Sequence, residues 1–148
     1  MAMVARWYVC AAMVAEADGR PGSRALVEYL LHGAWACDDA GDVDAPSDCR
    51  ERTAAALQAL HEAGDRYRFD DASADCALLA DLRRRSGRPL EAGAAARAGL
   101  ELADSPFFRR LLELQLRLAE LCDTDAHLYE EALADAGAEP DEQVVGDT

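Results

Sequence analysis

The chain has 148 residues, which suffices for one domain with its own hydrophobic core, and 32 of these residues are alanine. Its 29 acidic residues outnumber 15 basic ones, all of them arginine, and the net charge of −14 argues against binding to nucleic acid or anionic membranes. Isoleucine is absent and valine is sparse, so strand-forming residues are scarce and the composition favours an all-α fold.

The acidic residues are spread along the whole chain and do not form one block. Two interpretations of this acidity stay open. Either it adapts the protein to a salty cytoplasm, or it forms a surface that attracts a basic partner. The even spread of the acidic residues favours salt adaptation.

The start of the chain decides between a secreted and a cytoplasmic protein. Arg6 precedes the apolar run Trp7–Ala15, and Ala15-Glu16-Ala17 has the small-x-small form of a signal-peptide cleavage site. The run is short, however, and its large residues share one helical face: Val4, Trp7, Tyr8, Ala11 and Val14. No run is long enough to span a bilayer, and the five widely spaced cysteines, without a CxxC pair, fit reduced thiols. We therefore expect an amphipathic first helix and a cytoplasmic location, with a signal peptide as the alternative.

Apolar periodicity predicts about seven helices. They lie at about 3–17, about 23–39, from the cap Ser47 after Pro46 to Gly64, about 72–85, about 89–103, from Ser105-Pro106 to Leu121, and from near Thr124 through Leu128, Ala132 and Leu133. The residues that follow are acidic and lose this periodicity. We therefore expect a single helical-repeat domain over residues 1–137 and an acidic flexible tail over residues 138–148.

Glycines punctuate the chain at regular intervals. Gly19, Gly41, Gly64 and Gly87 each follow a periodic segment, and the intervals between them are 22, 23 and 23 residues. Glycine just past a helix end adopts the left-handed conformation without steric cost. Because an interval of about 23 residues corresponds to one helix and one connection, the spacing predicts stacked antiparallel helical hairpins.

The stretch "LLADLRRRSGRPLEAGAAARAGLELADSP", residues 78–106, resembles a tetratricopeptide (TPR) repeat. The resemblance assigns packing and turn roles to five residues: Leu79 and Ala80 in the first helix, Gly87 at the turn, Ala92 at the close helix crossing and Leu100 near the end of the second helix. It implies a TPR-like superhelix of about three hairpins, whose first helices line a concave groove.

The match to the TPR pattern has departures: Cys76 replaces an aromatic residue, Arg83 a tyrosine and Gly99 an alanine, and Pro106 comes two residues late. Residues 30–42 and 49–60 resemble a second hairpin with a longer turn. The order of hairpins also resembles the C-terminal part of an uncharacterised bacterial and archaeal family, in which a zinc ribbon precedes TPR-like hairpins. The chain lacks the paired cysteines of that ribbon.

Few residues suggest chemistry. His61-Glu62 resembles the start of a zinc-hydrolase helix, but position 65 is Asp where that motif requires a second histidine. We therefore expect a helix end there, and neither a metal nor another cofactor. Cys49 is the best candidate for a reactive thiol, because it lies near a predicted helix start and two arginines. The Arg83–Arg85 cluster should complete a helix and pair with nearby acidic residues.

These features favour a non-catalytic scaffold that binds a protein or peptide. The negative net charge of the chain favours a basic partner. The register of the second, fourth and sixth helices assigns eight exposed residues to the binding face: Glu28, His32, Asp39, Asp75, Asp81, Arg109, Glu113 and Arg117. Two alternatives stay open. One is a thiol-based enzyme or redox sensor that uses Cys49 or Cys37, and the other is a structural homodimer, which a large exposed apolar face on the sixth helix would mark.

Overall fold

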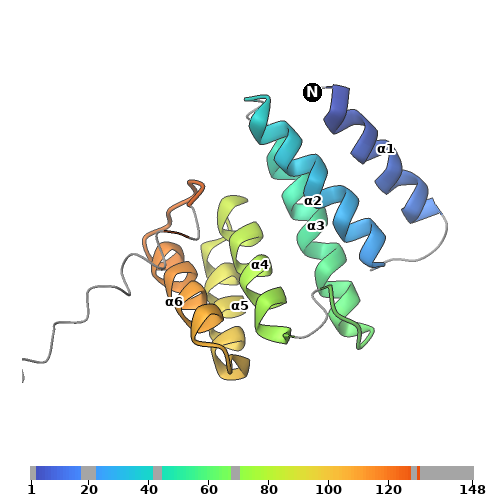
Figure 1. Ribbon diagram of the computed structural model, residues 1–148. Helices are drawn as coiled ribbons and strands as arrows, with labels where there is room; N and C mark the ends of the chain where they lie inside the picture. Colours follow the sequence, from blue (N-terminus) through green and yellow to red (C-terminus); the bar gives the residue numbers. More distant parts are fainter. Residues whose placement is uncertain (1–2, 18–22, 42–44, 68–70, 128–129, 131–148) are drawn as a thin grey trace, which may run out of the picture.

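The computed structural model describes residues 3–17, 23–41, 45–67, 71–127 and 130, and these residues form helices joined by turns (Figure 1). The six helices are α1 (Met3–Ala17), α2 (Arg24–Asp39), α3 (Ala45–Glu62), α4 (Ala72–Arg85), α5 (Pro89–Leu102) and α6 (Pro106–Glu120). The all-α class predicted from the composition is confirmed. The helix expected from Thr124 does not begin there, because residues 124–127 are not helical, and its apolar residues lie outside the described part.

Local sequence signals explain most of the helix starts. The side chains of Ser23 and Asp71 accept backbone N–H groups in the first turns of α2 and α4, at 3.2 and 2.9 Å. Pro89 and Pro106 open α5 and α6, where a missing N–H removes no helical hydrogen bond. The exception is α3, which begins at Ala45, so Ser47 lies inside the first turn and is not the cap that we expected.

Three helices end at a glycine in the left-handed conformation, as we expected from the position of these glycines after periodic segments. Gly41, Gly64 and Gly87 have φ values of +68°, +78° and +74°, while Gly19 lies outside the described residues. In this conformation the N–H groups just past the helix bond back to its last carbonyls. Cys122 ends α6 in the same way with φ +54°, although it carries a Cβ atom.

The helices pack in chain order, with α1, α2 and α3 side by side at one end of the molecule and α4, α5 and α6 at the other (Figure 1). One apolar cluster joins α1, α2 and α3 to α4 through residues such as Leu57 and Leu82, and a second joins α4, α5 and α6 through Ala96 and Leu112. Among the described helices α4 packs against α3, α5 and α6, but it has no direct backbone contact with α2.

Small residues allow the close contacts in the second half of the molecule. Ala80 on α4 and Ala92 on α5 are fully buried. At Gly99 a Cβ atom would lie 2.6 Å from a methyl carbon of Leu112 and 2.7 Å from Cβ of Cys76. Gly99 therefore lets α5 approach both α4 and α6.

The first helix does not present the face that we expected to the core. Trp7 and Val14 are 73% and 63% exposed, whereas Ala12 is fully buried. The apolar residues of α1 lie on more than one face, so helical spacing alone did not determine which face is inward. On α6, by contrast, the apolar residues Leu111, Leu112, Leu114 and Leu118 are buried, so a large exposed apolar face is not found there.

Replacing Cys122 by glycine is expected to raise the free energy of unfolding by about 1 kcal/mol, because glycine adopts a positive φ without the clash of a Cβ atom. The measurement is equilibrium denaturation. Gly64→Ala is the matched reverse change and should lower that free energy by about as much, since its Cβ atom would meet nothing within 4 Å and only the backbone is strained. A Cys122→Gly variant no more stable than the parent chain would contradict this account.

Candidate functional site

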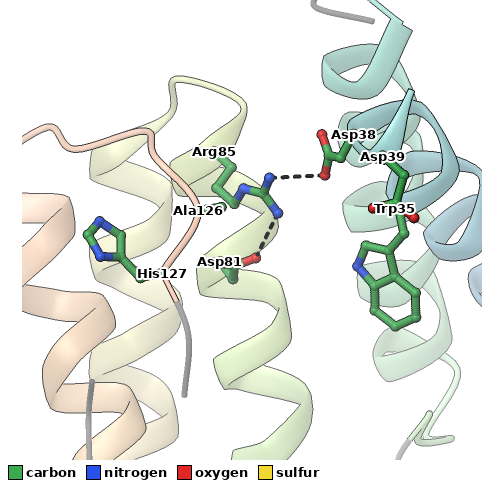
Figure 2. A pocket seen from close by; sticks show the side chains of 7 residues that line it. All are labelled: Trp35, Asp38, Asp39, Asp81, Arg85, Ala126 and His127. Atoms are coloured by element: carbon green, nitrogen blue, oxygen red, sulfur yellow. Dashed lines mark hydrogen bonds and ion pairs between the residues drawn. The ribbon is translucent and has the colours of Figure 1, made fainter. Parts of the chain in front are cut away.

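An open pocket of about 400 Å³ lies between α2 and α4, where the two helices have no backbone contact. Figure 2 shows α2 on one side of it and α4, with the segment after α6, on the other. The lining side chains are Trp35, Asp38 and Asp39 from α2, Asp81 and Arg85 from α4, and Ala126 and His127 from the segment after α6.

Arg85 crosses the pocket and links its two walls (Figure 2). Its Nη2 donates to Oδ2 of Asp38 at 3.0 Å, and its Nη1 lies 3.9 Å from Oδ2 of Asp81. Arg50 on α3 forms an ion pair with the other oxygen of Asp38. The Asp38 carboxylate is therefore shared by two guanidinium groups, and the separation of α2 from α4 is spanned by an ion pair.

Arg84, the neighbour of Arg85, holds the segment that carries the far wall. Its fully buried side chain donates through Nε to Gln115 at 2.9 Å and through Nη2 to Asp81 at 2.9 Å. Its Nη1 donates to the backbone carbonyls of Asp123 and Asp125, both at 2.8 Å. These bonds fix residues 123–125 against α4 and α6, and so position Ala126 and His127.

Asp123 reinforces this segment from within. Its carboxylate accepts the N–H of Asp125 at 2.8 Å and pairs with Nε2 of His127 at 3.0 Å. The backbone N–H of Asp125, followed by His127 and Arg84, lowers the pKa of the Asp123 carboxyl below its ordinary value. The ionised carboxylate therefore stabilises the fold above the ordinary pKa, and this contribution is lost as the pH falls through the lowered pKa.

An aromatic row leads along α2 to the pocket. The ring of His32 lies 5.3 Å from that of Tyr8 and 5.1 Å from that of Trp35, measured between centroids. His32 Nε2 is 2.8 Å from Oε1 of Glu28, whose other oxygen accepts the hydroxyl of Tyr67. Trp35 is 45% exposed although it contributes to the pocket. The row therefore ends in an indole that a partner can reach.

Seven of the eight residues assigned to the binding face fall into three groups. Asp39 and Asp81 line the pocket, and Glu28 and His32 lie on α2 at its aromatic approach. The residues of α6, all exposed, are not among those that line the pocket: Arg109, Glu113 and Arg117.

Asp75 does not reach the surface. Its side chain is fully buried and accepts hydrogen bonds from His61 Nε2 at 2.9 Å and from the N–H of Tyr67 at 2.8 Å. The expected exposure failed because the partners of Asp75 come from the preceding helix and connection, which helical register does not show. His61 thus has a structural partner, and α3 ends at Glu62, two residues before Gly64, as that glycine predicted.

The positions assigned by the TPR resemblance lie at helix contacts and at a turn. Ala80 and Ala92 are fully buried, and Leu79 and Leu100 pack at the edges of the two apolar clusters. Gly87 forms the turn between α4 and α5.

Sequence reasoning missed several pocket residues, above all Trp35, which it did not assign to the binding face. A local signal was present, because Asp38 and Asp39 follow Trp35 by three and four residues and so share its side of the helix. The contribution of His127 had no such signal, since it depends on the tertiary contacts of Arg84. The expected pairing of the Arg83–Arg85 cluster with acidic residues is confirmed.

The candidate thiols are poorly placed for chemistry. Cys37 and Cys49 are buried, and burial raises the pKa of the Cys49 thiol, with further contributions from Cys37 and Asp48. Arg52 acts in the opposite direction, but the pKa stays raised. Within the described ranges, no three His, Cys, Asp or Glu side chains gather as metal ligands.

Comparisons of the chain with protein-family models, with curated proteins and with solved structures gave no match. Within the described part of the chain, each helix is too short or too polar to cross a bilayer.

Replacing Arg84 by methionine is expected to lower the free energy of unfolding by about 3 kcal/mol, because the variant leaves two backbone carbonyls, Gln115 and Asp81 without their buried donor. Chemical denaturation measures the change. Arg97→Met is the matched control, since the ion pair of Arg97 with Glu120 is 3.7 Å long and exposed, and it should change the free energy by less than about 0.5 kcal/mol. Equal effects of the two substitutions would contradict the role of Arg84.

Alkylation of the folded chain at neutral pH should modify the exposed Cys122 first. Cys37 and Cys49 should react only as the protein unfolds, because they are buried and the pKa of Cys49 is raised. Mass spectrometry of peptides after timed labelling measures the order, with the denatured chain as the control. Rapid labelling of Cys49 at pH 6 would instead support the thiol-based enzyme or redox sensor.

Proposed function

We propose that this chain is a non-catalytic, TPR-like binding module, and that the pocket between α2 and α4 receives an arginine or lysine side chain from a protein or peptide partner. One observation carries the proposal: the exposed indole of Trp35 and the exposed carboxylate of Asp39 lie on the same pocket. Its volume of about 400 Å³ is within the range of sites that enclose a small group.

The indole favours a cation. A guanidinium or ammonium group is attracted to the face of a tryptophan ring, and this contact contributes about 0.5–2 kcal/mol. An acidic side chain would gain less, because the net charge of −14 attracts cations to the surface and repels anions. An aliphatic side chain would gain less because it carries no charge for the indole or the carboxylates to attract.

The carboxylates of the pocket have different tasks. Asp38 and Asp81 are paired with arginines of the same chain, so they support the walls of the pocket. Asp39 is exposed and has no ion pair with another described residue. We therefore assign the direct contact with the partner's cation to Asp39, with Trp35 beside it.

The aromatic row suggests the path of the rest of the peptide. His32 and Glu28 follow Trp35 along α2 towards its N-terminal end, so a peptide anchored in the pocket can run along this helix. The exposed residues on α6 offer further contacts to a larger partner: Arg109, Glu113 and Arg117.

Isothermal titration with a short peptide of alternating arginine and glycine tests the proposal, with a peptide that has glutamate for arginine as the control ligand. We expect binding of the basic peptide alone at about 0.15 M salt, where long-range attraction is screened. Trp35→Ala and Asp39→Asn should each weaken this binding about five- to tenfold, through loss of the cation–π contact and of the ion pair.

Asp104→Asn is the matched control. Asp104 is exposed and lies between α5 and α6, so this substitution removes the same charge at a place away from the pocket. It should leave the affinity within about twofold at this salt concentration. Equal weakening by Asp39→Asn and Asp104→Asn, or equal binding of the acidic peptide, would show that the pocket does not recognise a cation.

A further inference from the structure

The first helix carries an apolar face that the rest of the described chain leaves uncovered. α1 lies at one end of the row of helices and packs against α2 alone among the described helices (Figure 1). Its inward side uses the fully buried Ala12, with Ala11 and Ala15 partly buried. On the other side Trp7, Met13 and Val14 are 73%, 58% and 63% exposed.

These exposed residues form one surface. Cys10 follows Trp7 by three residues and Val14 follows Cys10 by four, so the three share one face of the helix, with Met13 beside them. A contiguous apolar patch of this kind marks an interaction site, whereas single exposed apolar residues are common on all proteins. The end of a helical stack that faces only water is normally polar.

The charge distribution identifies the occupant. α1 contains one basic residue, Arg6, and one acidic residue, Glu16, so the net charge of −14 lies entirely on the rest of the chain. The Glu16 carboxylate is also paired with Arg52 of α3, at 2.8 and 2.9 Å. Two copies of a strongly acidic chain repel each other least when they meet at a face without net charge. A neutral face offers no electrostatic attraction to a basic partner or to an anionic lipid surface.

We propose that the outer face of α1 is the contact between two copies of this chain. An antiparallel pair of α1 helices about a twofold axis places Trp7 of one copy beside Met13 or Val14 of the other. Because Cys10 lies between Trp7 and Val14 on the same face, the two Cys10 side chains come close to the axis. The residues that line the pocket between α2 and α4 are not on α1, so this contact does not use the site of the proposed peptide binding.

Light scattering during size-exclusion chromatography tests the contact, with an expected mass of twice 16.0 kDa for the full chain. Val14→Glu and Trp7→Ala should each raise the dissociation constant of the dimer at least about tenfold. Leu90→Glu is the matched control, since Leu90 is 88% exposed on α5 and receives the same charge. Circular dichroism of each variant shows whether the helices are retained.

A short thiol-specific bifunctional cross-linker provides a second measurement that needs no change in the apolar face. It should join two chains through Cys10, so Cys10→Ser removes the covalent dimer while Cys122→Ser, at the other exposed cysteine, preserves it. A monomeric mass at all concentrations would overturn the proposal. So would a dimer that persists in folded Val14→Glu or is joined only through Cys122.

Discussion

The buried guanidinium of Arg84 is the interaction on which the second half of the molecule depends. Burying a charge is costly unless its donors are satisfied, and here they reach an amide, a carboxylate and two backbone carbonyls. The two carbonyls belong to the segment after α6, which has no helix of its own at residues 121–127. The far wall of the pocket is thus a consequence of one satisfied side chain on α4, and Arg85, the next residue, completes the wall from the same helix.

The pocket exists because two helices do not meet. α4 packs against α3, α5 and α6, while α2 packs against α1 and α3, so among the described residues the space between α2 and α4 is crossed by side chains alone. An apolar contact would have filled this space. An ion pair between Arg85 and Asp38 spans it instead, and the pocket beside this ion pair is open to solvent.

The fold was more predictable from the sequence than the site. Helix ends were visible because a positive φ requires a particular residue, as at Gly64 and Gly87, and alanine content determined the class. The sequence did not show which side of α1 faces inward, because the apolar residues of that helix lie on more than one face. The burial of Asp75 and the exposure of Trp35 were not visible for a related reason: burial depends on which other helix lies opposite, and the periodicity of one helix carries no such information.

The neutrality of α1 has a consequence for how the molecule responds to salt. α1 has no net charge, so salt screens chiefly the forces between ions and the rest of the chain. Contacts made by the apolar face of α1 are therefore far less sensitive to ionic strength than contacts made by the carboxylates that line the pocket.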